Sequence, residues 1–354
     1  MGHELQRIIR ALRSATLAGS SAAAYQRAVE LWVAYCRGAP SHRHGSLDWQ
    51  PGIRHLDLCV RGYVASIYER GGGRRRQSAV DTVYGLYLYY PDIRGRLTRS
   101  EQLLHGWARR HPPLSHPPLT WPLVTLIAVT MALNGYADGA LATLVAFDGL
   151  LRVSEMANLC IGDVSPPTDP RRGRSAIPAG TLPSPTLPSA HVILRFAKTK
   201  TGSNQSVWLT HAAVERLLLL HVHGRDAGAR VFQLTTPSHQ TSPTGAYRHA
   251  LRVVCDALGL GSHHFTPHSL RHGGATHALL HLGQSIETIM QRGRWQSNSS
   301  CRVYLQAGRA RLLELSVDSS ILSLAEDVVD DWYTTCRDAV VPSSSVVQPC
   351  HSRG

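Results

Sequence analysis

The chain has 354 residues, 43% of them hydrophobic, and its 37 Lys and Arg against 24 Asp and Glu give a formal net charge of +13. The length allows two domains with sizeable cores, and the charge favours a polyanionic partner, nucleic acid first. No signal-peptide core opens the chain, and the most apolar stretch, 121–159, is broken at Asn134-Gly135 and Asp138-Gly139, so we expect no membrane insertion.

Residues 1–110 are expected to form an all-helical domain. Apolar side chains recur at helical spacing in 21–38, 55–70 and 78–90. A basic Gly-Gly-Gly-Arg-Arg-Arg turn precedes the last of these helices. Such a turn is either a solvated loop or a clamp on a phosphate backbone. We favour the clamp, and its candidate DNA-binding residues are Arg74, Arg75 and Arg76.

A proline-rich linker at 111–120 separates this domain from a second one at 121–310. The second domain is expected to begin with helices. A segment rich in Pro, Ser and Gly follows at 164–190 and predicts an irregular insertion. Two strands, 191–197 and 205–210, are then joined by the turn Lys-Thr-Lys-Thr-Gly-Ser-Asn as a hairpin, and helices continue to about residue 310.

The C-terminal region predicts one more helix, 311–335, followed by a disordered tail at 336–354. The helix is either a final core helix or one that docks on a neighbouring subunit. Its apolar stripe consists of Ile321, Ala325, Val328 and Trp332. The predicted fold is therefore mainly α with a small β-sheet: an N-terminal helical domain and an α+β domain.

The first motif with a candidate functional residue is the apolar run Leu-Leu-Arg-Val-Ser-Glu. Arg152 lies in it, three residues before Glu155. An unpaired buried guanidinium is costly, and Glu155 lies on the same helical face, where it can act as the partner. The motif alone fits a structural ion pair as well as a site that binds a phosphate.

The second motif runs from His268 to Tyr304. His268 and Arg271 share one helical face, Trp295 follows, and Tyr304 lies nine residues beyond it. Two arginines can grip the non-bridging oxygens of one phosphate, and nearby positive charge or a base makes a phenol reactive. The order suits a site that holds a phosphodiester while a phenolate attacks it, although most tyrosines in proteins only pack.

Only two lysines occur in the chain, Lys198 and Lys200, both in the hairpin turn. Lysine can give up a proton near neutral pH when its pKa is lowered, whereas arginine cannot. A site that must donate a proton would resist the replacement of Lys by Arg. The alternative is chance survival of two lysines on an exposed turn.

A cluster of histidines raises the question of a metal site. Pairs four residues apart can bind zinc, but neither a His-Glu-x-x-His motif nor a Cys-x-x-Cys pair accompanies them, so no metal and no other cofactor is expected. The histidines concerned are His263, His264, His268, His272, His277 and His281.

Together, the motifs resemble the tyrosine recombinase family of the phage-integrase type. Leu-Leu-Arg-Val-Ser-Glu resembles its first arginine box, His-Ser-Leu-Arg-His its second, and the segment from Gly293 to Leu305 its closing motif with the nucleophile. The Gly-Arg-Trp form, the insertion and the arginine bias resemble eukaryotic transposon-encoded members of the DIRS or crypton type. This likeness implies residence in the nucleus, with the bacterial cytoplasm as the alternative.

The resemblance implies a reaction in which a tyrosine attacks a DNA phosphate, leaving a 3′-phosphotyrosine and a free 5′-hydroxyl. It assigns the nucleophile to Tyr304, phosphate binding to Arg152 and Arg271, and protonation of the leaving oxygen to Lys200, with Lys198 as the alternative. His268 would assist proton transfer, and Trp295 would contact the phosphate or buttress the site. Glu155 and His272 would support these residues.

The partners that the resemblance implies are double-stranded DNA and three further copies of the chain, in a homotetramer on two duplexes. The N-terminal helices would then form a core DNA-binding domain. Two other functions fit the same motifs: a catalytically inactive, recombinase-derived DNA-binding protein, and an enzyme similar to type IB topoisomerases.

Overall fold

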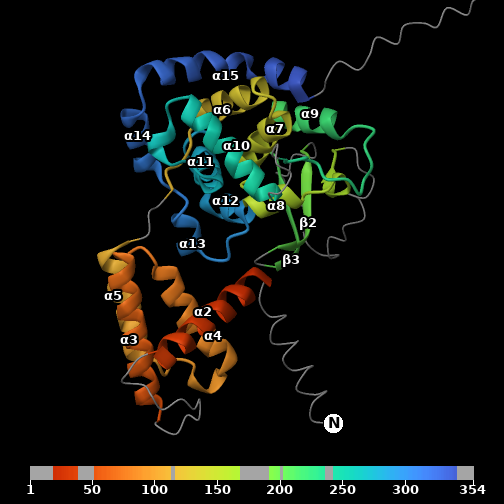
Figure 1. Ribbon diagram of the computed structural model, residues 1–354. Helices are drawn as coiled ribbons and strands as arrows, with labels where there is room; N and C mark the ends of the chain where they lie inside the picture. The colour runs from red at the N-terminus through yellow and green to blue at the C-terminus, as the bar shows by residue number, and fades with distance from the viewer. Residues whose placement is uncertain are drawn as a thin grey trace, which may run out of the picture. The chain divides into compact units, whose positions relative to one another are not determined.

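A computed structural model describes the structure of the chain (Figure 1). The chain divides into two compact units, residues 1–115 and 116–354. Helices dominate, and the described strands form one small sheet, so the predicted fold class is confirmed. The described residues are 19–38, 52–112, 116–167, 191–199, 202–235 and 242–340.

The first unit is helical, as its apolar periodicity predicts. Helix α2 packs on α4, and α3 packs on α5. The buried carboxylate of Asp57 in α3 accepts the backbone N–H groups of Arg99 and Ser100 at 3.1 and 3.0 Å, which secures the first turn of α5. The elements are α2 (Gly19–Gly38), α3 (Ile53–Gly71), α4 (Arg76–Tyr89), the 3-10 turn Pro91–Ile93 and α5 (Thr98–Arg110).

The second unit is built around two helices whose side chains are almost all buried, α6 (Trp121–Leu133) and α7 (Ala137–Asp148). Their largely apolar sequences have no continuous polar face to turn toward water. The remaining helices surround this pair. They are α8 (Val153–Asn158), α9 (Ala212–Val222), α10 (Pro243–Ala257), α11 (Pro267–Leu280), α12 (Ile286–Gly293), α13 (Asn298–Arg302), α14 (Ala307–Ser316) and α15 (Ser319–Val340), with 3-10 turns at Ile161–Asp163 and Gly261–His263.

The sheet contains the predicted hairpin, β2 (Ile193–Thr199) and β3 (Gly202–Trp208), paired antiparallel with Leu194 opposite Val207. A short strand that was not predicted, β1 (Val164–Ser165), pairs with the other edge of β2. The expectation of an irregular insertion is therefore wrong at its start, where Val164 is buried against the core. The rest of that insertion, from residue 168 to 190, lies outside the described residues.

The single helix predicted at 311–335 is two helices, because α14 ends at Ser316 and the Asp318 side chain accepts the backbone N–H of Ser320 as α15 begins. Helix α15 packs on α6 of its own chain, along the blue edge of the unit in Figure 1. The predicted tail is wrong at its start, because Cys336 and Val340 are buried and the helix continues through them. Residues 341–354 lie outside the described residues.

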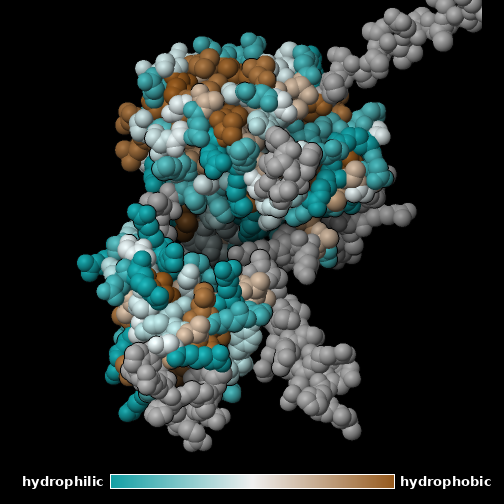
Figure 2. Space-filling view, viewed as in Figure 1, coloured by the Kyte–Doolittle hydropathy of each residue, from teal (hydrophilic) through white to brown (hydrophobic). Residues whose placement is uncertain are grey.

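Apolar side chains remain exposed beside this contact. Leu312 and Leu315 of α14 are 64% and 84% exposed, and Leu324 of α15 is 47% exposed. Figure 2 shows apolar surface at the end of the unit where these two helices lie. The buried side of α15 thus packs within its own chain, while these leucines remain exposed to solvent. Among the helices of the described residues, none has the length and apolar character to cross a bilayer.

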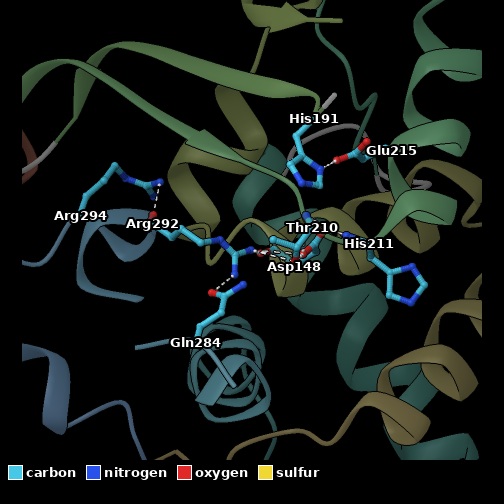
Figure 3. Close-up of polar contacts among 8 residues, drawn as sticks. All are labelled: Asp148, His191, Thr210, His211, Glu215, Gln284, Arg292 and Arg294. Atoms are coloured by element: carbon cyan, nitrogen blue, oxygen red, sulfur yellow. Dashed lines mark hydrogen bonds and ion pairs between the residues drawn. The ribbon is translucent and has the colours of Figure 1, made fainter. Parts of the chain in front are cut away.

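One buried ion pair joins three parts of the second unit (Figure 3). The Asp148 carboxylate, at the end of α7, accepts backbone N–H groups from Thr210 and His211 after β3 at 2.9 to 3.1 Å. Arg292 of α12 donates to the same carboxylate at 3.2 Å and to Gln284 at 2.9 Å. The end of α7, the end of the hairpin and α12 are therefore fixed to one another.

Two adjacent glycines allow α11 to approach its neighbours closely. A Cβ at Gly273 would overlap the carbonyl oxygen of Leu119, and a Cβ at Gly274 would overlap that of Phe147. In both cases the obstacle is backbone, which cannot swing aside as a flexible side chain does. The position of α11 thus depends on the absence of side chains at these two residues.

We predict that Gly273→Ala lowers the stability of the second unit, although Ala normally stabilises a helix interior by roughly 0.5–1 kcal/mol relative to Gly. Overpacking of this kind costs about 1–3 kcal/mol, and thermal unfolding would detect it. Gly308→Ala in α14 is the matched control, because nothing lies within 4 Å of a Cβ there. A Gly273→Ala variant as stable as the control would contradict the close approach of α11.

Candidate active site

The first candidate arginine begins α8. Arg152 is the residue that caps this helix, and its backbone N–H donates to Oε2 of Glu155 at 2.8 Å, while its Nη1 donates to Oε1 at 2.6 Å. The side chain of Glu155 is 5% exposed and that of Arg152 is 18% exposed. The ion pair suggested by the sequence is therefore present, with the carboxylate on its buried side and the guanidinium nearer to solvent.

Arg294 is a third guanidinium at this site, and sequence reasoning missed it. Its Nη2 donates to Oε2 of Glu155 at 2.6 Å, and its side chain is 3% exposed. Burial alone would raise the pKa of Glu155, but Arg294 and then Arg152 lower it below its ordinary value. One ionised carboxylate thus serves two arginines.

The second candidate arginine, Arg271 of α11, is fully buried. It donates to the carbonyl oxygens of Leu150 and Gly293, and within the described chain it forms no ion pair. Its guanidinium carbon lies 4.4 Å from the centre of the Trp295 ring and 5.3 Å from that of Tyr304. Burial, reinforced by Arg152 and Arg294, lowers the pKa of Arg271. Two aromatic rings therefore cover a cation that has no anionic partner of its own in the described chain.

The candidate nucleophile is half-buried beside this cation. The Tyr304 ring stacks on His272 at 4.4 Å and meets Trp295 at 4.7 Å. Its backbone is tied to α11 as well: the Thr276 hydroxyl donates to the carbonyl of Tyr304 at 3.2 Å and accepts the N–H of Gln306 at 3.1 Å. The tyrosine therefore belongs to the cluster predicted from the sequence, held by a threonine that the sequence did not single out.

Three imidazoles lie close together here. His268 is exposed and stacks on His116 at 5.5 Å, and His272 is buried. Although His268 is exposed, neighbouring atoms remove part of its solvation, and this loss, with His116 and Arg271 nearby, lowers the pKa of His268. Burial, together with His116 and His268, lowers the pKa of His272 to about 4. Both rings are therefore neutral at pH 7. His116 was missed because it lies in the segment interpreted as a linker.

Not all predicted residues can be placed in this cluster. The backbone of Lys198 lies in β2 opposite Ser203, but its side chain and the whole of Lys200 lie outside the described residues. Arg74, Arg75 and Arg76 belong to the first unit. Arg74 and Arg75 are exposed, and Arg76 donates to the carbonyl of Leu104 at 3.2 Å.

Several of the clustered histidines pack against other rings. His277 contacts Phe147 at 5.6 Å and stacks on His281 at 4.9 Å, and His263 stacks on Phe265. In the part of the chain that the structure describes, no three His, Cys, Asp or Glu side chains are grouped so that they could hold a metal ion.

The arrangement can bind an anion and supply a nucleophile. Arg152 and Arg294 share the Glu155 carboxylate, and Arg271 has no carboxylate of its own in the described chain, so positive charge is in excess here. The Tyr304 phenol and neutral imidazoles lie beside these cations. Preorganised cations of this kind stabilise negative charge that develops on a phosphate during its transfer.

Comparison with known proteins gives one match to a family model. The Phage integrase family matches residues 124–311, a range that includes every candidate catalytic residue and excludes the basic turn of the first unit. A crystal structure of XerA recombinase aligns over 92% of this chain and 97% of that chain, with 16% sequence identity and a TM-score of 0.37, which is too low to inform the site. No curated protein matches the chain.

The covering of Arg271 by rings predicts its reactivity. We expect phenylglyoxal, which modifies accessible guanidiniums, to leave Arg271 unmodified in the free wild-type protein and to modify it in Tyr304→Ala. Tyr304→Phe is the matched control, because it keeps the ring and should keep the protection. Peptide mass spectrometry measures the modification.

Two other arginines serve as controls in the same experiment, one for the folded state and one for the reaction itself. Arg292 is 1% exposed and should stay unmodified in all three proteins, whereas exposed Arg302 should be modified in all of them. Equal reaction of Arg271 in the wild type and in Tyr304→Ala, with Arg292 still protected, would show that the tyrosine ring does not shield it.

Proposed function

The chain belongs to the phage integrase family, and we propose that it is a site-specific DNA recombinase that cuts and rejoins DNA through a covalent 3′-phosphotyrosine intermediate. The observation that supports this most directly is the contact between the half-buried Tyr304 ring and Arg271, a guanidinium without an ion-pair partner in the described chain. A tyrosine needed only for packing would not require a buried cation at its side.

In the proposed reaction, the oxygen of Tyr304 forms a bond to phosphorus, and the bond from phosphorus to the 5′ oxygen breaks. The phenol proton passes to a base, for which neutral His268 is the candidate, and the leaving oxygen takes a proton from a lysine of the hairpin. Arg152 and Arg271 stabilise the charge on the non-bridging oxygens. The phosphodiester energy is kept in the phosphotyrosine, so a second 5′-hydroxyl can reverse the step and join a new strand.

This proposal requires movement at the site. Arg271 is fully buried under Trp295 and Tyr304 in the free protein, so a phosphate reaches its guanidinium only after at least one ring shifts. Tyr304 is the candidate, because it is half-buried and lies in the short connection between α13 and α14. The free protein is thus proposed to be a closed form that DNA opens.

Double-stranded DNA is the proposed partner, since the net charge of +13 and the exposed Arg74 and Arg75 supply cations for its backbone. We propose a homotetramer on two duplexes, in which the uncovered leucines of α14 meet a neighbouring subunit. A transposon-encoded origin and residence in the nucleus remain predictions from the closing motif.

The test uses nicked duplexes of random sequence, in which the cut strand diffuses away and traps the covalent complex. We expect the wild-type protein to form a complex with DNA that survives denaturation, and Tyr304→Phe to form none, because it lacks the attacking oxygen. Gel electrophoresis in detergent measures the complex, and sequencing of the trapped DNA identifies the site.

The control is the same substitution at a second tyrosine of the chain. Tyr333 of α15 packs against Trp332 and Arg216, so Tyr333→Phe should trap DNA as the wild type does. DNA binding without any covalent complex would refute the recombinase proposal and favour a DNA-binding protein without catalytic activity. Relaxation of supercoiled DNA without sequence preference would instead favour an enzyme similar to a topoisomerase.

The hairpin gives a separate prediction. We expect Lys200→Arg to lose more cleavage than Lys198→Arg, because arginine cannot release a proton to the leaving oxygen, and a general acid contributes roughly 10²–10⁴-fold. The measurement is the rate of complex formation with the trapped duplex. The reverse order would assign the proton to Lys198.

A further inference from the structure

We infer that Arg294 is a positioning residue, which aligns Arg152 for phosphate binding through Glu155; this inference rests on the proposed function. Neither the family match nor the sequence motifs assign this residue a role. It is not a ligand for DNA itself, because its side chain is 3% exposed and both of its terminal nitrogens donate to oxygens of the protein.

The backbone of Arg294 shows that its side chain matters. Arg294 ends α12 in the left-handed region, with φ 56° and ψ 42°. Glycine is the usual residue at such a position, and a residue with a side chain costs roughly 1 kcal/mol more there. If the side chain made no favourable contacts, a glycine here would give a more stable protein. The contacts made by the guanidinium must therefore offset this cost.

These contacts reach two other elements. Nη2 of Arg294 donates to Oε2 of Glu155 at 2.6 Å, across 139 residues of sequence. The guanidinium carbon lies 4.9 Å from the ring centre of Phe196 in β2, and Nη1 donates to the carbonyl of Arg292 at 3.2 Å. Arg294 thus joins the start of α8, the lysine hairpin and the segment that carries Trp295.

Glu155 transmits this contact to the phosphate site. Its two oxygens accept three hydrogen bonds: Arg294 and the backbone N–H of Arg152 share Oε2, and Nη1 of Arg152 takes Oε1. With Oε2 held by Arg294, the carboxylate has one orientation, so Nη1 of Arg152 is fixed as well. Without Arg294, the Glu155 carboxylate is bonded only to groups of Arg152. The carboxylate and the Arg152 guanidinium could then shift together, and the guanidinium would lose its fixed position.

The opposite view is that Arg294 serves only the stability of the fold. The two views differ in a measurable way. A residue that only stabilises lowers the fraction of folded protein but leaves the folded enzyme fully active. A positioning residue slows the chemical step in protein that is fully folded. Its loss leaves DNA affinity unchanged, because Arg294 does not touch DNA and a misaligned Arg152 still attracts the phosphate by its charge.

The experiment compares Arg294→Met with Arg311→Met, a matched loss of charge at an exposed position on α14. Binding of the trapped duplex is measured in the Tyr304→Phe background, and cleavage is measured as single-turnover formation of the covalent complex. We expect Arg294→Met to slow cleavage on the order of a hundredfold, as misplacement by about 1 Å can do, with affinity unchanged. Arg311→Met should cleave as the wild type does.

Two further variants test the route through Glu155. Arg294→Lys keeps the charge but lacks the fork, so it should recover part of the rate, and it carries the comparison if the Met variant does not fold. Combining Arg294→Met with Glu155→Gln should cost little beyond the larger single loss, because both act on one contact. Fully additive losses, an unchanged rate, or a rate that falls only with DNA affinity would overturn the inference.

A readout without catalysis separates this inference from the proposed function. Hydrogen exchange of the peptide spanning 150–158 should speed up in Arg294→Met and not in Arg311→Met, because the Arg152 N–H loses a fixed acceptor. Faster exchange with no covalent complex even in the wild type would refute the recombinase but keep the positioning role. Unchanged exchange would refute the positioning role, whatever the enzyme does.

Discussion

The buried ion pair between Asp148 and Arg292 is the constraint on which the site depends. Asp148 lies four residues before Arg152, and Arg292 lies three residues before Trp295. Holding these two side chains together brings the first arginine box and the closing segment to one place. Removal of one partner from such a buried pair typically costs about 3–5 kcal/mol, because the other charge is left uncompensated. The pair therefore fixes the separation of the two segments that line the site.

Helix α11 supplies the other half of that framework. Gly273 and Gly274 bring its backbone against the carbonyl groups of Leu119 and Phe147. On the same helix, the Arg271 guanidinium lies beneath the aromatic rings, and the Thr276 hydroxyl binds the backbone just after the tyrosine. Because one rigid helix carries both the cation and the tether of the tyrosine, their separation does not depend on a flexible loop alone.

The sequence motifs singled out residues that the fold brings together, but they did not indicate what surrounds those residues. Arg152, Arg271 and Tyr304 were found because each lies in a local motif, and the hairpin because its alternation is local as well. Arg294 could not be found, since its partner Glu155 is 139 residues away. The end of α15 was misjudged because burial of Cys336 and Val340 depends on tertiary packing. The residue types likewise did not indicate that the rings of Trp295 and Tyr304 would cover Arg271, because this contact depends on side-chain conformation.

That covering explains how the free protein tolerates its excess of positive charge. Arg152 and Arg294 share the single carboxylate of Glu155, so Arg271 is left with carbonyl oxygens and the faces of Trp295 and Tyr304. A cation over an aromatic face gains about 0.5–2 kcal/mol, less than a charge-assisted, forked contact with a phosphate supplies. We therefore propose that a bound phosphate displaces the tyrosine ring from Arg271. The released phenol would then lie next to the phosphorus that it is proposed to attack.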